Sequence, residues 1–424
     1  HTWFDLGLFI DRFREKHAQE ERCVPERFEN FSTRLRNGGI GFVTFHYMVD
    51  GVTVETGKYA ALIEKQFPGI PVHYIGGTFR NKSETVIPGR YIRYRIPELA
   101  GFNEWDLYEP FFMQELERGS KSYNALIEAF WEETLRIVKK LGTYVREQGI
   151  EVVYVVNVCS NPGNVSAALA LVLLSEFLKI PVINNNHDFY FEGGRSRFDR
   201  SSKGLKKGPR DFFFTNAHLG EVFSIIEMLF PWESKFWLNV NINSTQTDHL
   251  VRYKGHNPAR VMEIGTAVDT KAYTKNDKRR NINTILQFET ILARYRKRLV
   301  SYSVEDVEAG PLVSEKKPRP ILIGHKTCPV EKFSAENIIF LQPTRIISRK
   351  RIELGFSLLK KIIDNREMQN RLVSTPNLKI TLLISGPIAS GHYDYFRKVL
   401  KRFRELIADV PEPFRSRVYL ALLL

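Results

Sequence analysis

The chain has 424 residues, too many for one ordinary domain, so we expect two or three domains. Its hydrophobic content of 43% and charged content of 26% are typical of a globular protein and exclude a disordered one. No run of 18 apolar residues predicts a membrane span, and we expect no leader peptide. Three widely spaced cysteines exclude a disulfide scaffold and a cysteine-based zinc site, and they favour the reducing cytoplasm.

The net charge of +14 raises the question of a nucleic-acid partner, because a clustered basic face is the usual electrostatic footprint of such proteins. The Lys and Arg residues are instead spread through helical segments with many acidic residues between them. An anionic small substrate or a membrane surface explains basic patches equally well. We therefore expect no nucleic-acid partner, and a peripheral membrane contact stays open. The densest basic stretches are residues 195–210, 275–280, 294–298 and 345–351.

The first 38 residues begin with a helical pattern and then become highly charged, and we expect them to form a packed N-terminal extension. From residue 39 to 269, short apolar runs alternate with helical patterns, which predicts an α/β domain with a parallel sheet. Ligands of such sheets bind past the carboxyl ends of the strands. The predicted strands are 40–45, 70–75, 152–158, 180–183, 236–243 and 261–264, and the loops of interest are 46–56, 76–85, 157–164 and 184–194.

The last of these loops has the most unusual composition. Three asparagines precede His187 and Asp188, and Glu192 follows shortly after. A histidine next to a carboxylate can hold a hydroxyl group or move a proton. A metal site would need a second pair of ligands at suitable spacing, and since none is present we expect no metal.

The loop after the first strand resembles a phosphate-binding loop only superficially. Five residues instead of four separate Gly51 from Gly57, and Tyr59 stands after Lys58 where a Ser or Thr would bind magnesium. The glycine still has a possible role, because Gly51 permits a tight strand-to-helix turn in which the protein backbone can approach a ligand. His46, in the same loop, is either a ligand contact or a structurally satisfied histidine, and both interpretations stay open.

Residues 270–337 change in character and are predicted to be a linker or insertion, with a helix over 281–300 and a short strand at 320–323. A second α/β domain begins at residue 338. Its predicted elements are strand 338–342, helix 349–365, strand 379–385, helix 393–407 and strand 418–424. Because an apolar parallel strand is an unusual last element, we expect this domain to continue beyond Leu424.

The turn between strand 338–342 and the following helix carries Arg345 and, five residues on, Lys350. A helix N-terminus presents unpaired N–H groups and a partial positive charge, which suits a phosphate. Arginine supplies a planar fork for phosphate oxygens, and lysine supplies a mobile charge. The alternative is a solvated basic turn without a ligand.

Several stretches, in this order, resemble the retaining GT-B glycosyltransferases of the group 1 type, family four. Residues 260–269 resemble the interdomain segment of that family, and residues 341–350 resemble its Gly-Arg-Leu-x3-Lys turn with the same offset from Arg345 to Lys350. Residues 382–387 resemble its next strand and Gly-rich turn, and residues 183–188 its His-Asp stretch. The resemblance implies two doubly wound, Rossmann-like domains that face a cleft, the second of them incomplete.

The sequence departs from that family at three places. Thr344 stands where a glycine usually precedes the arginine, and Gly265-Thr-Ala replaces Pro-Asn-Gly in the interdomain segment. The Glu-x7-Glu element that holds the sugar and ribose of the donor does not occur after Gly386. The last departure is the one that puts the donor site in doubt, unless the chain continues.

By this resemblance, the chain is a cytoplasmic retaining glycosyltransferase that moves a hexose from a nucleotide-diphosphate sugar, UDP- or GDP-hexose, to a polar small molecule or glycan. It would require no further cofactor, because two cations can do the work of a metal at the leaving diphosphate. The implied catalytic residues are His187, Asp188, Arg345 and Lys350, the implied donor-binding residues Gly51, Arg345, Lys350 and Gly386, and the implied acceptor-binding residues Lys58 and Glu192.

Two other functions remain open at this point. One is a non-catalytic GT-B-like protein that binds a nucleotide or a partner without turnover. The other is a basic nucleic-acid-binding α/β protein, which would lose affinity steeply with salt and would not bind nucleotide sugars. The oligomeric state cannot be read from the sequence.

Overall fold

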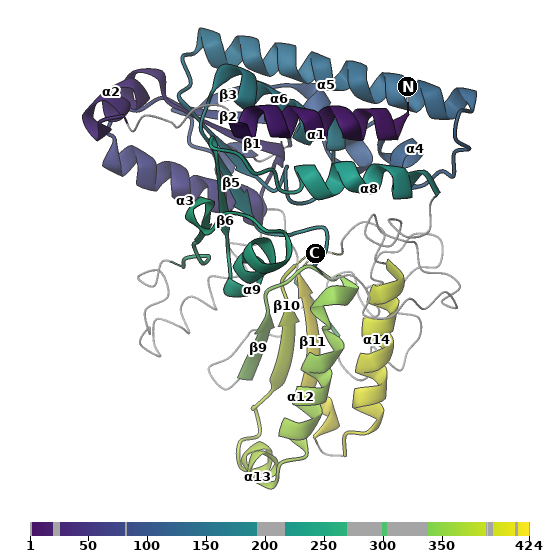
Figure 1. Cartoon of the computed structure of the whole chain (residues 1–424). Helices are drawn as coiled ribbons and strands as arrows, with labels where there is room; N and C mark the ends of the chain where they lie inside the picture. Colours follow the sequence, from purple (N-terminus) through teal and green to yellow (C-terminus); the bar gives the residue numbers. More distant parts are fainter. Residues whose placement is uncertain are drawn as a thin grey trace. The chain divides into compact units, whose positions relative to one another are not determined.

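A computed structural model describes residues 2–19, 26–80, 83–192, 217–268, 299–302, 338–386, 388, 393–411 and 414–423. The chain divides into two compact units, residues 1–268 and 269–424, here called unit 1 and unit 2 and each described by itself (Figure 1). The basic stretches 195–210, 275–280 and 294–298 and the predicted strand 320–323 lie outside the described residues.

Unit 1 is built on a seven-stranded sheet in which all neighbouring strands are parallel, in the order β3-β2-β1-β4-β5-β6-β7. The predicted α/β class with a parallel sheet is confirmed. The sequence does not predict β3, because this strand is short, mostly exposed and at the sheet edge. The strands are β1 (Ile40–Tyr47), β2 (Val72–Phe79), β3 (Ile92–Arg95), β4 (Val152–Val156), β5 (Val182–Asn186), β6 (Trp237–Asn241) and β7 (Val261–Glu263).

Helices cover both faces of this sheet (Figure 1). Successive residues of a strand point to opposite faces, so β1 contributes Phe42 to one hydrophobic cluster and Val43 to the other. One face carries α2 (Phe28–Gly38) and α3 (Gly51–Gln66). The other carries α1 (Trp3–Gln19), α4 (Tyr108–Phe112), α5 (Lys121–Glu147), α6 (Val165–Leu178) and α8 (Ala217–Leu229).

Polar caps start the helices directly after the strands and thereby shorten the predicted loops. Asp50 accepts a hydrogen bond from the Thr53 N–H at 2.9 Å, so α3 begins four residues after the end of β1. The predicted loop 46–56 is therefore wrong in extent, and Gly76 and Gly77 of the predicted loop 76–85 belong to β2. Short helical turns complete the loops at Ser83–Thr85, Pro97–Leu99, Phe102–Glu104 and Pro258–Arg260, and α9 (Ser244–Asp248) continues into a π-helical turn, His249–Tyr253.

The largest correction concerns the three asparagines 184–186, which the sequence places in a loop. They form the second half of β5, and none of them is exposed. The side-chain nitrogen of Asn184 donates to Asn239 Oδ1 at 2.8 Å, and that of Asn186 donates to Asn241 Oδ1 at 3.1 Å across the neighbouring β6. Since the side-chain nitrogen of Asn185 also donates, to the Tyr154 hydroxyl at 2.7 Å, all three amide nitrogens of this polar run are bonded inside a buried strand.

Unit 2 has a four-stranded sheet in the order β8-β11-β10-β9, in which β9, β10 and β11 are parallel and β8 is antiparallel to β11. Its helices pack together over one hydrophobic cluster, where the rings of Phe356 and Phe403 lie 5.9 Å apart. The elements are β8 (Leu299–Tyr302), β9 (Ile338–Gln342), α12 (Glu353–Ile363), α13 (Arg366–Ser374), β10 (Ile380–Ile384), α14 (Tyr393–Ala408) and β11 (Val418–Leu423).

The predicted strands and the second predicted helix of this unit are confirmed, but α12 begins later than predicted. Residues 348–350 form a 3-10 turn, and Arg351 has the positive φ of 47°, so the α-helix starts only at Glu353. The predicted helix 281–300 is wrong at its end, where residues 299 and 300 belong to β8. The remainder of that helix lies outside the described residues.

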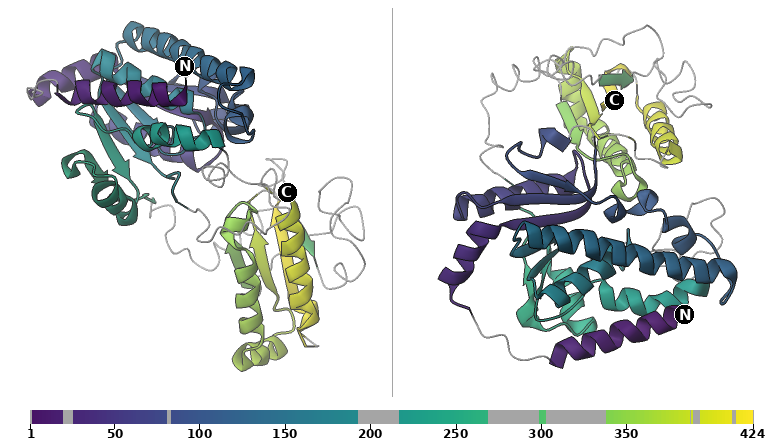
Figure 2. Two further views of the ribbon diagram at one scale, coloured as in Figure 1. Left: turned by 45° about the vertical axis from the view of Figure 1, so that its right-hand side comes forward. Right: turned by 90° about the horizontal axis from the view of Figure 1, so that it is seen from above.

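Helix α1 belongs to the core of unit 1. Trp3 is fully buried, with its ring 5.5 Å from that of Phe111 and 5.3 Å from that of Phe130, both in edge-to-face contact. Both views of Figure 2 show α1 beside α8. The first helix is thus part of the folded unit and not a separate arm.

We expect Trp3→Ala to lower the free energy of unfolding of unit 1 by about 3–5 kcal/mol, because it removes a buried aromatic side chain and leaves a cavity. Urea unfolding of the full chain, followed by circular dichroism, measures the loss. The matched control is Phe4→Ala, since Phe4 is the next residue of the same helix and is 59% exposed. A similar loss in both variants would contradict the packing of α1 described here.

Candidate functional site

Polar side chains gather in unit 1 where the parallel strands end, the edge at which such sheets bind ligands. His46 lies near the end of β1 and Thr78 near the end of β2. Asn157 follows β4, His187 follows β5, and Gln246 lies in α9 after β6. Five consecutive positions in the sheet order therefore contribute to one edge.

The segment 187–192, here called the His187 loop, is held by Asn157. The Asn157 Oδ1 accepts hydrogen bonds from the N–H of His187 at 2.8 Å and from the N–H of Asp188 at 3.2 Å. Asn157 is nearly buried and has a φ of 60°, a left-handed conformation that asparagine tolerates better than most residues. The two predicted catalytic residues of this loop are thus fixed at the start of the turn.

The imidazole of His187 is set into the protein. Its Nε2 is buried and has no hydrogen-bond partner among the described residues. Burial lowers the pKa of His187 below its usual value of 6.5, and the positive charge of Lys58 acts in the same direction. The carboxylates of Glu55 and Asp188 oppose this shift without reversing it. At neutral pH the ring is therefore uncharged and can offer a hydrogen bond to a hydroxyl group.

Lys58 and Glu192, the predicted acceptor-binding residues, are both engaged in bonds within the unit. Lys58 Nζ donates to Glu55 Oε2 at 2.7 Å and to the carbonyl oxygen of Ala267 at 2.6 Å. The carboxylate of Glu192 accepts from the Phe189 N–H at 2.8 Å. Their bonds hold the fold together, and a role in acceptor binding stays a prediction.

Gly51 is the first residue of α3 and is exposed. It lacks the positive φ that favours glycine, and a Cβ atom placed on it would meet nothing within 4 Å. The turn from β1 to α3 is closed by the Asp50 cap instead. The structure therefore does not require glycine for this turn, contrary to the sequence argument, and donor binding by Gly51 stays a prediction.

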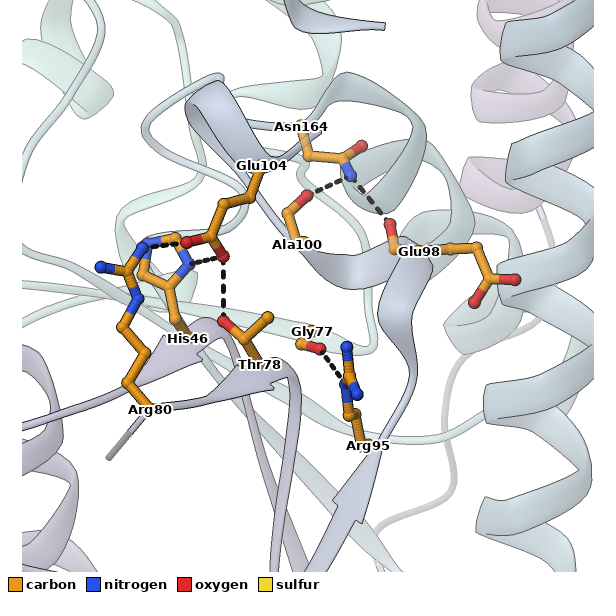
Figure 3. Close-up of polar contacts among 9 residues, drawn as sticks. All are labelled: His46, Gly77, Thr78, Arg80, Arg95, Glu98, Ala100, Glu104 and Asn164. Atoms are coloured by element: carbon orange, nitrogen blue, oxygen red, sulfur yellow. Dashed lines mark hydrogen bonds and ion pairs between the residues drawn. The ribbon is translucent and has the colours of Figure 1, made fainter. Parts of the chain in front are cut away.

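A second polar cluster surrounds His46 at the ends of β1 and β2 (Figure 3). The carboxylate of Glu104 forms an ion pair with Arg80, accepts a hydrogen bond from Thr78 Oγ1 at 3.1 Å, and lies 3.9 Å from His46 Nδ1. Burial lowers the pKa of His46, and Glu104 counteracts this. The sequence does not single out Thr78, Arg80 or Glu104, because Glu104 lies 24 and 26 residues from its two partners.

Backbone contacts fix the segment that carries Glu104 (Figure 3). Asn164 Nδ2 donates to the carbonyl oxygens of Glu98 at 2.9 Å and Ala100 at 2.8 Å. A Cβ atom on Gly77 would lie 2.1 Å from the Ala100 nitrogen, so only glycine permits this approach. The loops after β2, β3 and β4 are therefore joined into one rigid edge.

In unit 2, the predicted diphosphate-binding residues lie on the turn that connects β9 to α12. Arg345 and Lys350 are both exposed, and neither forms an ion pair with any residue that the structure describes. Their charges are thus available to a ligand. Phosphate binding at this turn stays a prediction.

Gly386 lies against the same turn. A Cβ atom on it would come within 2.1 Å of the Thr344 oxygen and 2.5 Å of the Arg345 nitrogen. The strands β9 and β10 are parallel neighbours, with Gln342 opposite Ile384, so the two turns meet at the carboxyl edge. Of the residues predicted for donor binding, the structure thus brings Gly386 and Arg345 together.

The described residues offer neither a cluster of metal-binding side chains nor a membrane-spanning helix. They contain no group of three or more His, Cys, Asp or Glu side chains that could hold a metal ion. Among these same residues, no helix is both apolar enough and long enough to cross a membrane.

No family model and no curated protein matches the chain. Solved structures similar to it include a glycosyltransferase from Rickettsia africae, with 12% identity over 90% of this chain and 67% of that chain and a TM-score of 0.41. A lipopolysaccharide outer core galactosyltransferase, WaaB, has 11% identity over 90% and 67% of the two chains and a TM-score of 0.40. A UDP-GlcNAc 2-epimerase from Neisseria meningitidis has 12% identity over 90% and 71% and a TM-score of 0.30.

These similar structures include glycosyltransferases, the class that the sequence resemblance implies, but also epimerases.

We expect His187 to titrate below pH 6.5, and Glu55→Gln to lower its pKa further because the opposing negative charge is removed. Lys58→Met should raise the pKa, since a positive charge disappears. NMR titration of the imidazole signals, assigned with His187→Ala, measures these shifts. Glu64→Gln serves as the control, because Glu64 lies near the other end of α3 in a bond with Arg90. A pKa of His187 that rises in Glu55→Gln would refute the electrostatic description.

Proposed function

We propose that the chain is a retaining glycosyltransferase that moves a hexose from a nucleotide-diphosphate sugar to a polar acceptor. The observation that carries this proposal is the turn after β9, where Arg345 and Lys350 are exposed and without an ion-pair partner among the described residues. Gly386 lies against the backbone of that turn. The order of motifs in the sequence supports the same reaction.

The turn suits the diphosphate of a sugar nucleotide. The guanidinium of Arg345 can bind two phosphate oxygens at once. The ammonium of Lys350, on its flexible side chain, can stabilise the negative charge that develops on the diphosphate as its bond to the sugar breaks. Stabilising a developing anion in this way is often the largest contribution to catalysis. The positive end of α12, which begins three residues after Lys350, adds to the field at the same turn.

In unit 1, His187 and Asp188 are the residues that we assign to the transferred sugar. The neutral imidazole of the partly buried His187 can bind a sugar hydroxyl, and the neighbouring Asp188 is held by the same Asn157 oxygen. Retention of the anomeric configuration, a UDP- or GDP-hexose donor, and a small or glycan acceptor are parts of this proposal. Gly51, Lys58 and Glu192 are its secondary contacts.

We expect Arg345→Ala and Lys350→Ala each to weaken the binding of UDP or GDP by about 10-fold or more, because each loses a charge-assisted contact with phosphate. Calorimetric titration of the full chain measures this. Both variants should unfold at the wild-type temperature, since both side chains are exposed. Lys361→Ala is the matched control, because it removes an exposed positive charge from the far end of α12.

Unchanged nucleotide affinity in both variants would refute the donor site. A wild-type chain that binds the nucleotide but transfers sugar from neither UDP-glucose nor GDP-mannose, either to water or to an added polyol, would instead be a nucleotide-binding protein without this activity. The first outcome tests the donor-binding site, and the second tests the transfer reaction.

A further inference from the structure

We propose that Gln246 is a positioning residue that, together with Asn157, fixes His187 for the transfer reaction, and this rests on the proposed function. Asn157 holds the N–H groups of His187 and Asp188 from the side of β4. Gln246 holds the carbonyl oxygen of His187 from the side of β6, where its Nε2 donates at 3.2 Å. The peptide groups on both sides of the His187 side chain are thus bound.

Gln246 is itself fixed in a single orientation. It is 1% exposed, and its Oε1 accepts a hydrogen bond from the Ile242 N–H at 3.0 Å. Its Nε2 faces three oxygens, the carbonyl of His187 and both carboxylate oxygens of Glu192 at 3.1 and 3.0 Å. A flipped amide would place an oxygen against those three acceptors, so only the observed orientation satisfies both ends.

Glu192 completes the loop from the other end. Its Oε2 accepts from the Phe189 N–H at 2.8 Å while the same carboxylate accepts from Gln246. The His187 loop is therefore closed on itself by a carboxylate that Gln246 holds. We call the bonds of Asn157, Gln246 and Glu192 to this loop the loop clamp.

Within the loop clamp, Asn157 and Gln246 act through His187 and do not touch a sugar. Gln246 is buried, and its donor and acceptor groups are all directed at the chain. In contrast, His187 is only partly buried, so part of its side chain can meet a ligand. Holding the backbone that carries the imidazole in one position before the substrate arrives lowers the barrier of the chemical step.

The fold explains why a residue 59 positions away can serve this purpose. Strand β6 is the direct neighbour of β5, so the helix that follows β6 begins beside the loop that follows β5. Asn243 caps α9 by accepting from the Gln246 N–H at 2.9 Å, and this cap places Gln246 in the first turn. The position of Gln246 is thus set by the sheet and the cap.

The test is a double-mutant cycle with Gln246→Met and His187→Ala, read by release of nucleotide from UDP-glucose and from GDP-mannose. We expect Gln246→Met to lower kcat by about 10-fold or more with KM changed by less than about threefold, because substrate contacts remain. In the His187→Ala background, Gln246→Met should cause no further loss, since it acts through the missing ring. Independent, multiplicative losses would overturn the proposal.

Asn239→Leu is the matched control. Asn239 is a fully buried amide in β6 that bonds to Asn184 and to the Trp232 carbonyl oxygen. We expect this variant to lose stability but to keep kcat. An equal fall in kcat in Asn239→Leu and Gln246→Met would show that general destabilisation is responsible, and would overturn a positioning role.

Hydrogen exchange followed by mass spectrometry tests the loop clamp without any substrate. Exchange of residues 187–192 should become faster in Gln246→Met and stay unchanged in Asn239→Leu, and no change in Gln246→Met would overturn the clamp. Should Gln246→Met fail to fold, Gln246→Asn keeps the polarity and shortens the reach. Faster exchange in a protein whose wild type releases no nucleotide would support the clamp while counting against the transfer reaction.

Discussion

The site of unit 1 depends on one buried oxygen atom, the Oδ1 of Asn157. Parallel strands end together at one edge, but their loops would be free to move there unless polar groups joined them. The Asn157 oxygen joins the loop after β4 to the first two peptides of the loop after β5. Asn157 has a left-handed backbone, and its side-chain oxygen reaches the start of the loop after β5.

Unit 2 depends on a constraint of a different kind, the close approach of two turns. Gly386 has no room for a side chain because the peptide between Thr344 and Arg345 lies where a Cβ would be. The approach fixes the backbone at Arg345 while leaving its side chain exposed. A fixed backbone with a mobile charged side chain is a suitable arrangement for a ligand that arrives with its own negative charge.

Much of the fold could be predicted from periodicity alone. The long amphipathic helix α5 follows from helical spacing, while α6 is apolar on all sides and follows from the length of its apolar run. The apolar runs of β4, β9 and β10 follow from strand length. The buried half of β5 could not be predicted, since three successive asparagines signal a loop until their partners in β6 are known. The edge strand β3 likewise lacks the local signal on which such predictions depend.

The sequence by itself determined the class of the fold, the basic turn at Arg345 and Lys350, and the unusual composition of the His187 loop. Each of these depends only on residues that are close together in the sequence. Only the tertiary structure decided which side chains remain for a ligand. Lys58 and Glu192 proved to be bonded within unit 1, while Gln246, Glu55 and Glu104 entered the site from distant positions. Hydrogen bonds between segments far apart in the chain decide which polar groups are already bonded, and no local sequence pattern predicts such bonds.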